Sequence, residues 1–157
     1  MQWIEGHSTV KIQAAGEGDY DEIADVWEAS VRETHHFLSS SDIDALKTVV
    51  REKLLPNTDI VLVRDDIGKI SGFAGVSGSK IEMLFVAPEY MGRGIGKRLF
   101  WHAVFEMNAH RLDVNESNLG ALDFYMRLGC KVTGRSPLDG MGNPYPILHL
   151  EWIRSEG

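Results

Sequence analysis

The sequence is poor in cysteine and has no long run of apolar residues. Its one cysteine, Cys130, has no partner for a disulfide within the chain, and its setting in LGCKV favours a buried thiol over a catalytic nucleophile. No window approaches the 18 consecutive apolar residues that a membrane-spanning helix requires, and the first residues lack the basic and apolar regions of a secretory signal. These absences predict a cytoplasmic protein with no membrane partner.

Positive charge is in the minority. Lysine and arginine total 16 against 23 aspartates and glutamates, which gives a net charge of -7. A negative field repels polyanions and mildly favours cationic partners, so we expect no nucleic-acid partner. No spacing among the six histidines resembles a metal site such as HExxH, and we therefore expect no metal.

The chain is long enough for one domain with a proper core. It has 157 residues, of which 43% are hydrophobic, and it is too short for two ordinary domains. No repeat, low-complexity tract or linker divides it, so we assign a single domain to residues 8–152.

Short apolar runs alternate with amphipathic stretches, which predicts a mixed fold of the α/β (α+β) class. The turn signals DDIG and SGS separate three β-branched runs between residues 59 and 88, which indicates an antiparallel meander. The later β-α-β units imply one parallel pair in the middle of the sheet. The expected strands are 10–15, 59–66, 69–77, 80–88, 110–115, 130–135 and 146–152, and the expected helices are 19–36, 43–56, 95–108 and 118–128.

A glycine-rich loop separates the meander from the third helix. The stretch EYMGRGIGKRLF (residues 89–100) has glycines at 92, 94 and 96. Glycines before a helix N-terminus let backbone N–H groups approach a phosphate closely. The spacing fails the dinucleotide fingerprint because Gly96 comes one place too early, and it fails the P-loop pattern because Arg98 follows Lys97.

Two motifs resemble those of the GNAT superfamily of acetyl-CoA-dependent N-acetyltransferases. Residues 91–96, MGRGIG, are similar to that family's Gln/Arg-x-x-Gly-x-Gly/Ala loop, with Met91 in place of Gln or Arg. Residues 118–132, NLGALDFYMRLGCKV, resemble Asn-x-x-Ala-x-x-Phe-Tyr-x-x-x-Gly-Phe, with Cys130 in place of the last Phe. The resemblance covers roughly residues 8–152 and implies a mostly antiparallel sheet of about seven strands flanked by about four helices. It also implies acetyl-CoA as co-substrate.

The resemblance assigns the cofactor to two segments and one helix start. The pantetheine arm would lie along the backbone of the fourth strand, and the pyrophosphate on the amides of the glycine loop, with added positive charge from Arg93 and Lys97. Asn118 would contact the arm, although a helix cap explains an Asn there equally well. The cofactor-binding residues implied are Leu84, Phe85, Val86, Gly92, Arg93, Gly94, Ile95, Gly96, Lys97 and Asn118.

The resemblance also assigns the chemistry, a direct transfer in a ternary complex. Tyr125 matches the family's general acid, and a phenol with a usual pKa of about 10 is protonated at neutral pH. Glu82 and Asp113 are the alternatives for the base, because a carboxylate on a central strand is uncommon as pure structure. Glu82 is preferred, on the expectation that it shares a face with Leu84 and Val86.

The acceptor is expected between residues 33–40 and 136–146, which hold His35, Phe37 and Tyr145. The segments THHFL and GNPYP resemble a subgroup of small bacterial acetyltransferases. His35 also fits a helix-end histidine without a role. The resemblance implies a primary amine of a small molecule or a peptide as acceptor, and leaves a homodimer open. The alternative function is a non-catalytic acyl-CoA-binding module.

Overall fold

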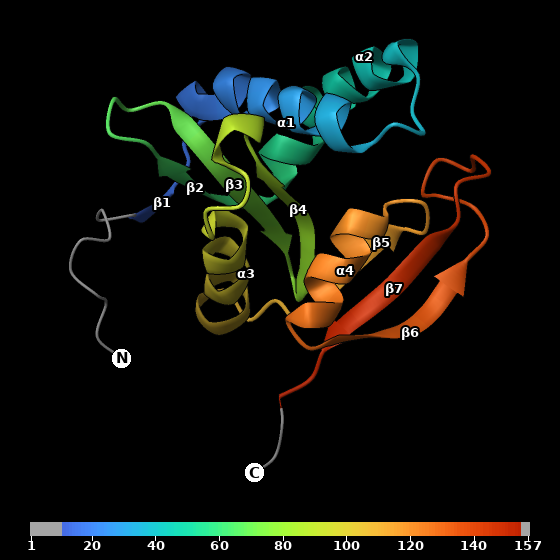
Figure 1. The fold of residues 1–157 in the computed structure, drawn as a ribbon. Coiled ribbons are helices and arrows are strands. Elements are labelled where there is room, and N and C mark those ends of the chain that lie inside the picture. The colour runs from blue at the N-terminus through green and yellow to red at the C-terminus, as the bar shows by residue number, and fades with distance from the viewer. Residues whose placement is uncertain (1–10, 155–157) are drawn as a thin grey trace.

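The computed structural model describes residues 11–154 (Figure 1). These residues form one seven-stranded sheet in the order β1-β2-β3-β4-β5-β7-β6, antiparallel except for the central β4–β5 pair. The expected fold class is confirmed; Val10 of the first expected strand, and residues 8–10 of the assigned domain, lie outside the described residues. The strands are β1 (Ile12–Ala14), β2 (Asp59–Arg64), β3 (Ile70–Ser77), β4 (Lys80–Val86), β5 (Arg111–Asn115), β6 (Cys130–Ser136) and β7 (Ile147–Trp152). The α-helices are α1 (Tyr20–Thr34), α2 (Ser40–Val49), α3 (Ile95–Glu106) and α4 (Leu119–Arg127).

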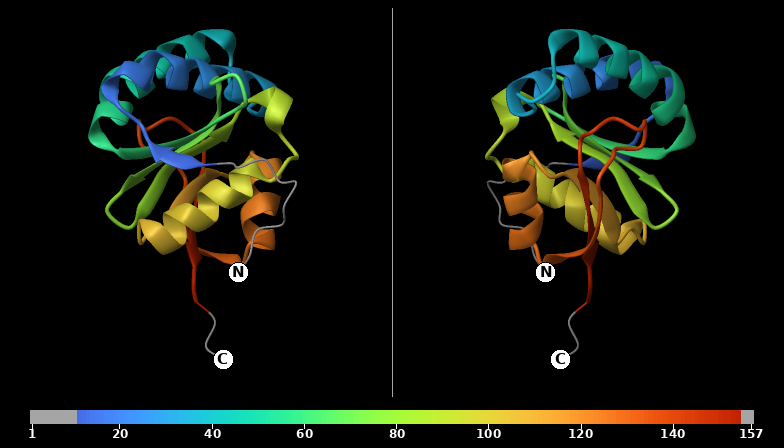
Figure 2. Two further views of the ribbon diagram at one scale, coloured as in Figure 1. Left: turned by 90° about the vertical axis from the view of Figure 1, so that its left-hand side faces the viewer. Right: turned by 90° about the vertical axis from the view of Figure 1, so that its right-hand side faces the viewer.

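Helices cover the two faces of the sheet unequally. Figures 1 and 2 show α1 and α2 over one face of the β1–β4 half, and α3 and α4 on the opposite face. Residues 70–76 of β3 are all buried, because helices pack on both sides of that strand. In β5 only the side facing α3 and α4 is buried, at Leu112 and Val114. The second half of the sheet therefore presents an open face on the side of α1 and α2.

The central strands separate soon after they meet. β4 and β5 pair only at Lys80 with Arg111 and at Ile81 with Leu112. On its other side, β4 has one residue more than β3: Met83 pairs with Gly75 and Ile81 pairs with Val76. Glu82 is the extra residue of this β-bulge, a feature that bends a strand and redirects its side chains. From Glu82 onward, the β4 edge that faces β5 is unpaired.

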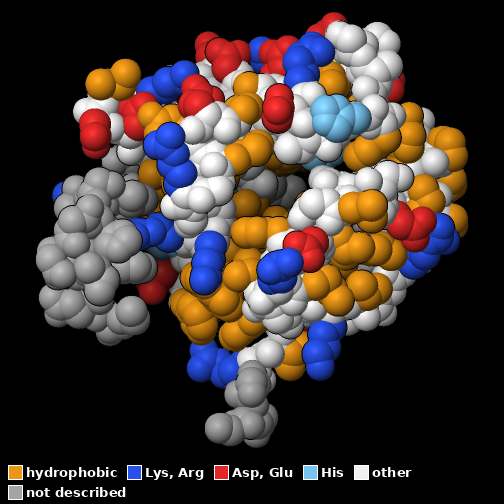
Figure 3. All heavy atoms as spheres, in the orientation of Figure 1, with side chains coloured by type: hydrophobic (Ala, Val, Ile, Leu, Met, Phe, Trp, Pro, Cys, Tyr) orange, Lys and Arg blue, Asp and Glu red, His pale blue; other side chains and the backbone are white. Residues whose placement is uncertain are grey.

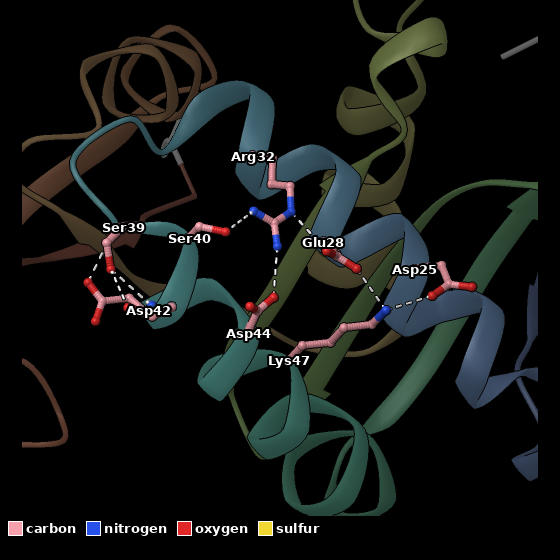
Figure 4. Close-up of polar contacts among 9 residues, drawn as sticks. Asp25, Glu28, Arg32, Ser39, Ser40, Asp42, Asp44 and Lys47 are labelled. Carbon is pink, nitrogen blue, oxygen red and sulfur yellow. Dashed lines mark hydrogen bonds and ion pairs between the residues drawn. The ribbon is translucent and has the colours of Figure 1, made fainter.

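Ion pairs join α2 to α1 (Figure 4). The Arg32 guanidinium donates to Glu28 at 2.8 Å and to Asp44 at 2.8 Å. The Lys47 ammonium donates to Asp25 at 2.8 Å and to Glu28 at 2.7 Å. Exposed pairs of this kind contribute only about 0.2–1 kcal/mol each, so their main effect is to fix the orientation of α2.

None of the helices within residues 11–154 combines the length and apolar character needed to cross a membrane.

Candidate active site

A cavity of about 600 Å³ occupies the space where β4 and β5 diverge. In the space-filling view the molecule is hollowed at this place, and hydrophobic side chains form part of the rim, among polar and charged ones (Figure 3). The end of α1, the start of α3 and the first turns of α4 complete its walls. The cavity brings together most residues expected from the sequence: Glu82, Leu84, Phe85, Val86, Gly92, Gly94, Ile95, Gly96, Lys97, Asp113, Asn118, Tyr125 and His35. Arg93, Phe37 and Tyr145 are not among the described residues that line it.

The glycine loop forms one end of the cavity and leads directly into α3. Gly92 has φ 81° and Gly94 has φ 85°, values that a residue with a Cβ adopts only with strain. Gly94 is the N-cap of α3 and offers no side chain to the helix's first N–H groups. Those N–H groups are therefore available to an anion at the positive end of the helix dipole.

Contacts with the β2–β3 turn anchor the loop from behind. The Tyr90 hydroxyl donates to Asp65 Oδ2 at 2.5 Å, and the Lys69 ammonium donates to Glu89 at 3.0 Å. The Arg93 guanidinium lies 5.1 Å from the centre of the Tyr90 ring, a cation–π contact. This contact holds the Arg93 side chain against Tyr90, and Arg93 is not among the described residues that line the cavity.

The unpaired edge of β4 forms the cavity's long side. Leu84, Phe85 and Val86 line it, and no strand of the described part of the chain pairs with their backbone groups on this edge. An extended molecule with amide groups can pair with such an edge as an added strand would. A free strand edge that ends at a helix N-terminus fits acetyl-CoA, which has an amide-bearing arm and a diphosphate.

Tyr125 projects from α4 to the cavity. It is only 8% exposed, and burial raises the pKa of its hydroxyl further above the usual range of a phenol, with a smaller effect from Cys130. Within residues 11–154 this hydroxyl forms no hydrogen bond, and it is not a fully enclosed atom without a partner. Tyr125 is thus a protonated donor that is not committed to another group, as a general acid must be.

The expected orientation of Glu82 is wrong. Leu84 and Val86 pack toward α3, whereas Glu82 lies 3.7 Å from the Lys80 ammonium on the open face. The β-bulge is the physical reason, since an extra residue in the strand breaks the alternation of side chains on which the expectation rested. Glu82 still lines the cavity.

Asp113 is held by two donors. Its Oδ2 accepts from Lys80 at 2.9 Å, and its Oδ1 accepts from His149 Nδ1 at 2.7 Å. Burial tends to raise the pKa of Asp113, but the hydrogen bonds from Lys80 and His149 outweigh it and hold the pKa below its usual range. A carboxylate stabilised in this way is a weak base.

His35 and Asn118 join α1 to α4 across the cavity. Asn118 caps α4 through Oδ1, which accepts from Ala121 N at 3.1 Å, and this leaves Nδ2 to donate to His35 Nε2 at 3.2 Å. The His35 proton must then be on Nδ1, which lies 2.8 Å from Thr34 Oγ1. Burial, and then the neighbouring His36, lower the pKa of His35, in agreement with a neutral ring. Both interpretations of Asn118 therefore remain compatible, since a helix cap can also face the cavity.

Comparison with known proteins decides the family. Residues 23–140 match the family described as "Acetyltransferase (GNAT) domain". The chain belongs to the GNAT acetyltransferase family. It is 35% identical over 141 residues to the peptidyl-lysine N-acetyltransferase YjaB of Salmonella typhimurium, a match that covers 90% of this chain and 97% of that protein.

Solved structures agree with this assignment. The solution structure of apo YjaB from Escherichia coli is similar with a TM-score of 0.83 and 34% identity, over 94% of this chain and 99% of that one. The PaiA N-acetyltransferase of Thermoplasma acidophilum, in complex with coenzyme A, has a TM-score of 0.74 at 20% identity over 92% and 99% of the two chains, a likeness of fold. The GNAT protein described here is accordingly an N-acetyltransferase, which transfers an acetyl group to an amine.

Aromatic rings gather on one side of the acetyltransferase cavity. The Phe37 ring lies 5.3 Å from His35 and 6.2 Å from Tyr145, measured between centroids. The His35 ring is in turn 6.3 Å from Phe85 of β4. The connection between α1 and α2 thus meets the loop between β6 and β7 next to the cavity wall.

Three polar residues on the open face of the sheet were not among the site residues predicted from the sequence. Lys80 binds Asp113, His149 binds the same carboxylate, and Ser136 Oγ lies 2.7 Å from His149 Nε2. The order of contacts from serine to histidine to aspartate is that of a hydrolase triad, but Lys80, Ser136 and His149 do not line the cavity. Their effect on the cavity passes through Asp113.

Proposed function

We propose that this protein transfers the acetyl group of acetyl-CoA directly to the ε-amine of a lysine in a protein or peptide. The observation that carries the proposal is the cavity itself. Three features of the described residues face one space: a β4 edge that no strand of residues 11–154 pairs with, a helix N-terminus behind two left-handed glycines, and a phenol without a partner among those residues. The names of the relatives support lysine as the acceptor, since YjaB is a peptidyl-lysine N-acetyltransferase.

The cofactor would be held mainly by backbone groups. The backbone of Leu84 to Val86 would bond the amides of the arm, and the N–H groups of residues 92–97 would bond the diphosphate, with Lys97 adding positive charge. Asn118 would contact the arm near its reactive end. Bound acetyl-CoA supplies an activated acetyl thioester, and the protein supplies the proton transfers around it.

Tyr125 is the proposed general acid. A thiolate that leaves the thioester needs a proton, and the Tyr125 hydroxyl, protonated and without another partner, can donate it. No other phenol lines the same part of the cavity between β4, β5 and α4 within residues 11–154; Tyr90 is committed to Asp65 at the far end of the glycine loop.

Glu82 is the proposed base. Both oxygens of Asp113 already accept hydrogen bonds, whereas the only partner of Glu82 within the described residues is Lys80, at 3.7 Å. A carboxylate with fewer bonds is better able to take a proton from the attacking amine, directly or through water. Asp113 would then hold Lys80 in place.

The lysine side chain would enter past the aromatic group formed by His35, Phe37 and Tyr145. Aromatic rings pack well against the methylene groups of a lysine stem. The proposed domain boundaries, 8–152, and a cytoplasmic location complete the proposal; acetyl-CoA and folded protein substrates are available there.

The test is a thiol-release assay with acetyl-CoA and a lysine peptide. We expect peptide-dependent release that falls by roughly 10²-fold or more in Tyr125→Phe and in Glu82→Gln, and less in Asp113→Asn. Calorimetric titration with CoA gives the control, because the first two variants should bind CoA as the wild type does. CoA binding without turnover on any amine would favour a non-catalytic acyl-CoA-binding module.

A further inference from the structure

Lys80 occupies an unusual position for a lysine. It begins β4 and does not itself line the cavity, but its ammonium contacts two carboxylates that do, at 2.9 Å from Asp113 Oδ2 and 3.7 Å from Glu82 Oε1. The side chains of all three residues are about 30% exposed, at 28% for Lys80, 31% for Glu82 and 32% for Asp113. A positive charge is therefore fixed next to the Glu82 and Asp113 carboxylates, which the amine of an acceptor must approach.

A chain of hydrogen bonds across four strands, β4, β5, β7 and β6, keeps Lys80 there. Asp113 Oδ2 binds the ammonium, while His149 Nδ1 donates to Asp113 Oδ1 at 2.7 Å. Ser136 Oγ lies 2.7 Å from His149 Nε2, so both ring nitrogens of His149 have a hydrogen-bonding partner. With both oxygens bound, the Asp113 carboxylate is fixed in orientation, and so is the lysine bound to it.

Acetyl transfer to a lysine faces an energetic obstacle. A free lysine amine has a pKa of about 10.4, so at neutral pH almost all of it is protonated and cannot attack a thioester. A like charge within about 4–6 Å favours loss of that proton, and lysine nucleophiles are known to be activated by an adjacent cation. The carboxylates alone would have the opposite effect, since they stabilise the ammonium.

We propose that Lys80 activates the acceptor electrostatically: its ammonium, held by the Asp113–His149–Ser136 chain, repels the acceptor's own ammonium and promotes transfer of its proton to Glu82. The freed amine then attacks the acetyl carbonyl, and the new C–N bond replaces the C–S bond. The leaving thiolate takes a proton from Tyr125, the second proton lost by the nitrogen restores the Tyr125 phenol, and Glu82 releases its proton to solvent. The inference rests on the proposed acetyl transfer to lysine. It predicts two opposing effects of Lys80. The lysine weakens binding of the charged acceptor, which raises KM, and it speeds the reaction of that acceptor, which raises kcat.

Other ionisable groups line the cavity or contact Asp113, and their effects on the pH profile must be controlled for. Glu82 lies on the same strand as Lys80, Asp113 on β5 and His149 on β7, and the helices contribute Tyr125 and His35. Arg111, the β5 residue paired with Lys80, is turned to Ser79 Oγ, to which its Nε donates at 2.8 Å. Substitution of Lys80 must therefore change the pH profile of the reaction in a way that can be distinguished from the effects of these other groups.

The experiment measures kcat and KM for a lysine peptide between pH 6 and 10 in the wild type, Lys80→Met and Lys80→Arg. Lys131→Met is the matched control, an exposed lysine of β6 outside the cavity. We expect Lys80→Met to move the rising limb of kcat up by roughly one pH unit, to lower kcat at pH 7 about tenfold and to lower KM several-fold. Lys80→Arg should keep the wild-type profile, and Lys131→Met should match the wild type.

A purely structural role for Lys80 would leave the rising limb of kcat in place, and that result overturns the inference. A higher KM in Lys80→Met would do the same. If Lys80→Met does not fold, Lys80→Gln is compared with the wild type on a peptide containing aminoethylcysteine, whose amine is less basic; the deficit of the variant must shrink on that acceptor. A wild type that acetylates no lysine peptide overturns the proposed function as well, whereas an active wild type with an unshifted variant overturns only the role of Lys80.

Discussion

Asn118 offers a direct measurement of the bond that closes the cavity between α1 and α4. Asn118→Ala removes two contacts at once, the cap on Ala121 N and the hydrogen bond to His35 Nε2. Loss of a helix cap costs about 1 kcal/mol, and loss of a part-buried hydrogen bond costs about 1 kcal/mol more. A domain of this size loses roughly 2–4 °C of Tm per kcal/mol, so we expect Tm to fall by roughly 4–8 °C.

Two further substitutions separate the contacts. Asn118→Ser keeps an oxygen for the cap but has no Nδ2, so urea denaturation followed by tryptophan fluorescence should give a loss of only about 1 kcal/mol. Asn118→Asp keeps the cap and places a carboxylate beside His35 Nε2, which should raise the pKa of His35 above its wild-type value. Equal destabilisation by Ser and Ala would refute the cap, and wild-type stability of the Ser variant would refute the bond to His35.

The same histidine makes stability depend on pH. Its pKa is lowered in the folded protein by burial and by His36, while the unfolded chain has the model-peptide value of 6.5. Below pH 6.5 the unfolded chain therefore binds more protons than the folded protein, and the free energy of unfolding decreases as the pH falls through this window. In Asn118→Asp this contribution should shrink, which NMR titration of the His35 ring and urea melts at two pH values can test; an unchanged slope would contradict the interpretation.

Three more outcomes follow from local geometry. Gly94→Ala should cost about 1–2 kcal/mol and weaken CoA binding in calorimetry, because φ is 85° there, whereas Gly140→Ala, in open space at an ordinary φ, should change neither. Cys130 should resist thiol reagents at pH 8 until the protein unfolds, since burial raises the pKa of its thiol to about 11; rapid labelling of the native protein would disagree. Arg32→Ala should lower the free energy of unfolding by no more than about 1 kcal/mol, and a larger loss would mean that the exposed α1–α2 pairs couple strongly.

Local chemistry in the sequence predicts much of this fold. The turn signals after residues 64 and 77 separate the strands of the meander, and glycines mark the N-terminus of α3 and the end of α4. The apolar faces of the helices follow from their periodicity. These features depend on residues close together in the chain, which is why the motif at residues 91–96 also locates one end of the cavity.

Features that depend on strand register cannot be predicted from the local sequence in this way. The face of Glu82 was predicted from strict alternation, and one extra residue in β4 reverses it. The chain from Lys80 to Ser136 needs β7 between β5 and β6, with His149 opposite both Asp113 and Gly134. Nothing in the local sequence around His149 specifies those partners, because the pairing is decided by packing across the whole sheet.

The early divergence of β4 from β5 makes the sheet two separable pieces. Among residues 11–154, two residue pairs are all the strand pairing that connects the β1–β4 half to the β5–β7 half. A molecule bound along the free edge of β4 would contact both halves of the sheet. Its binding should therefore slow amide hydrogen exchange in the β1–β4 half and in the β5–β7 half. At a ligand concentration of about 100 times Kd, such binding stabilises the folded state by about 2.7 kcal/mol. The donor substrate would in this way also stabilise the folded enzyme for as long as it is bound.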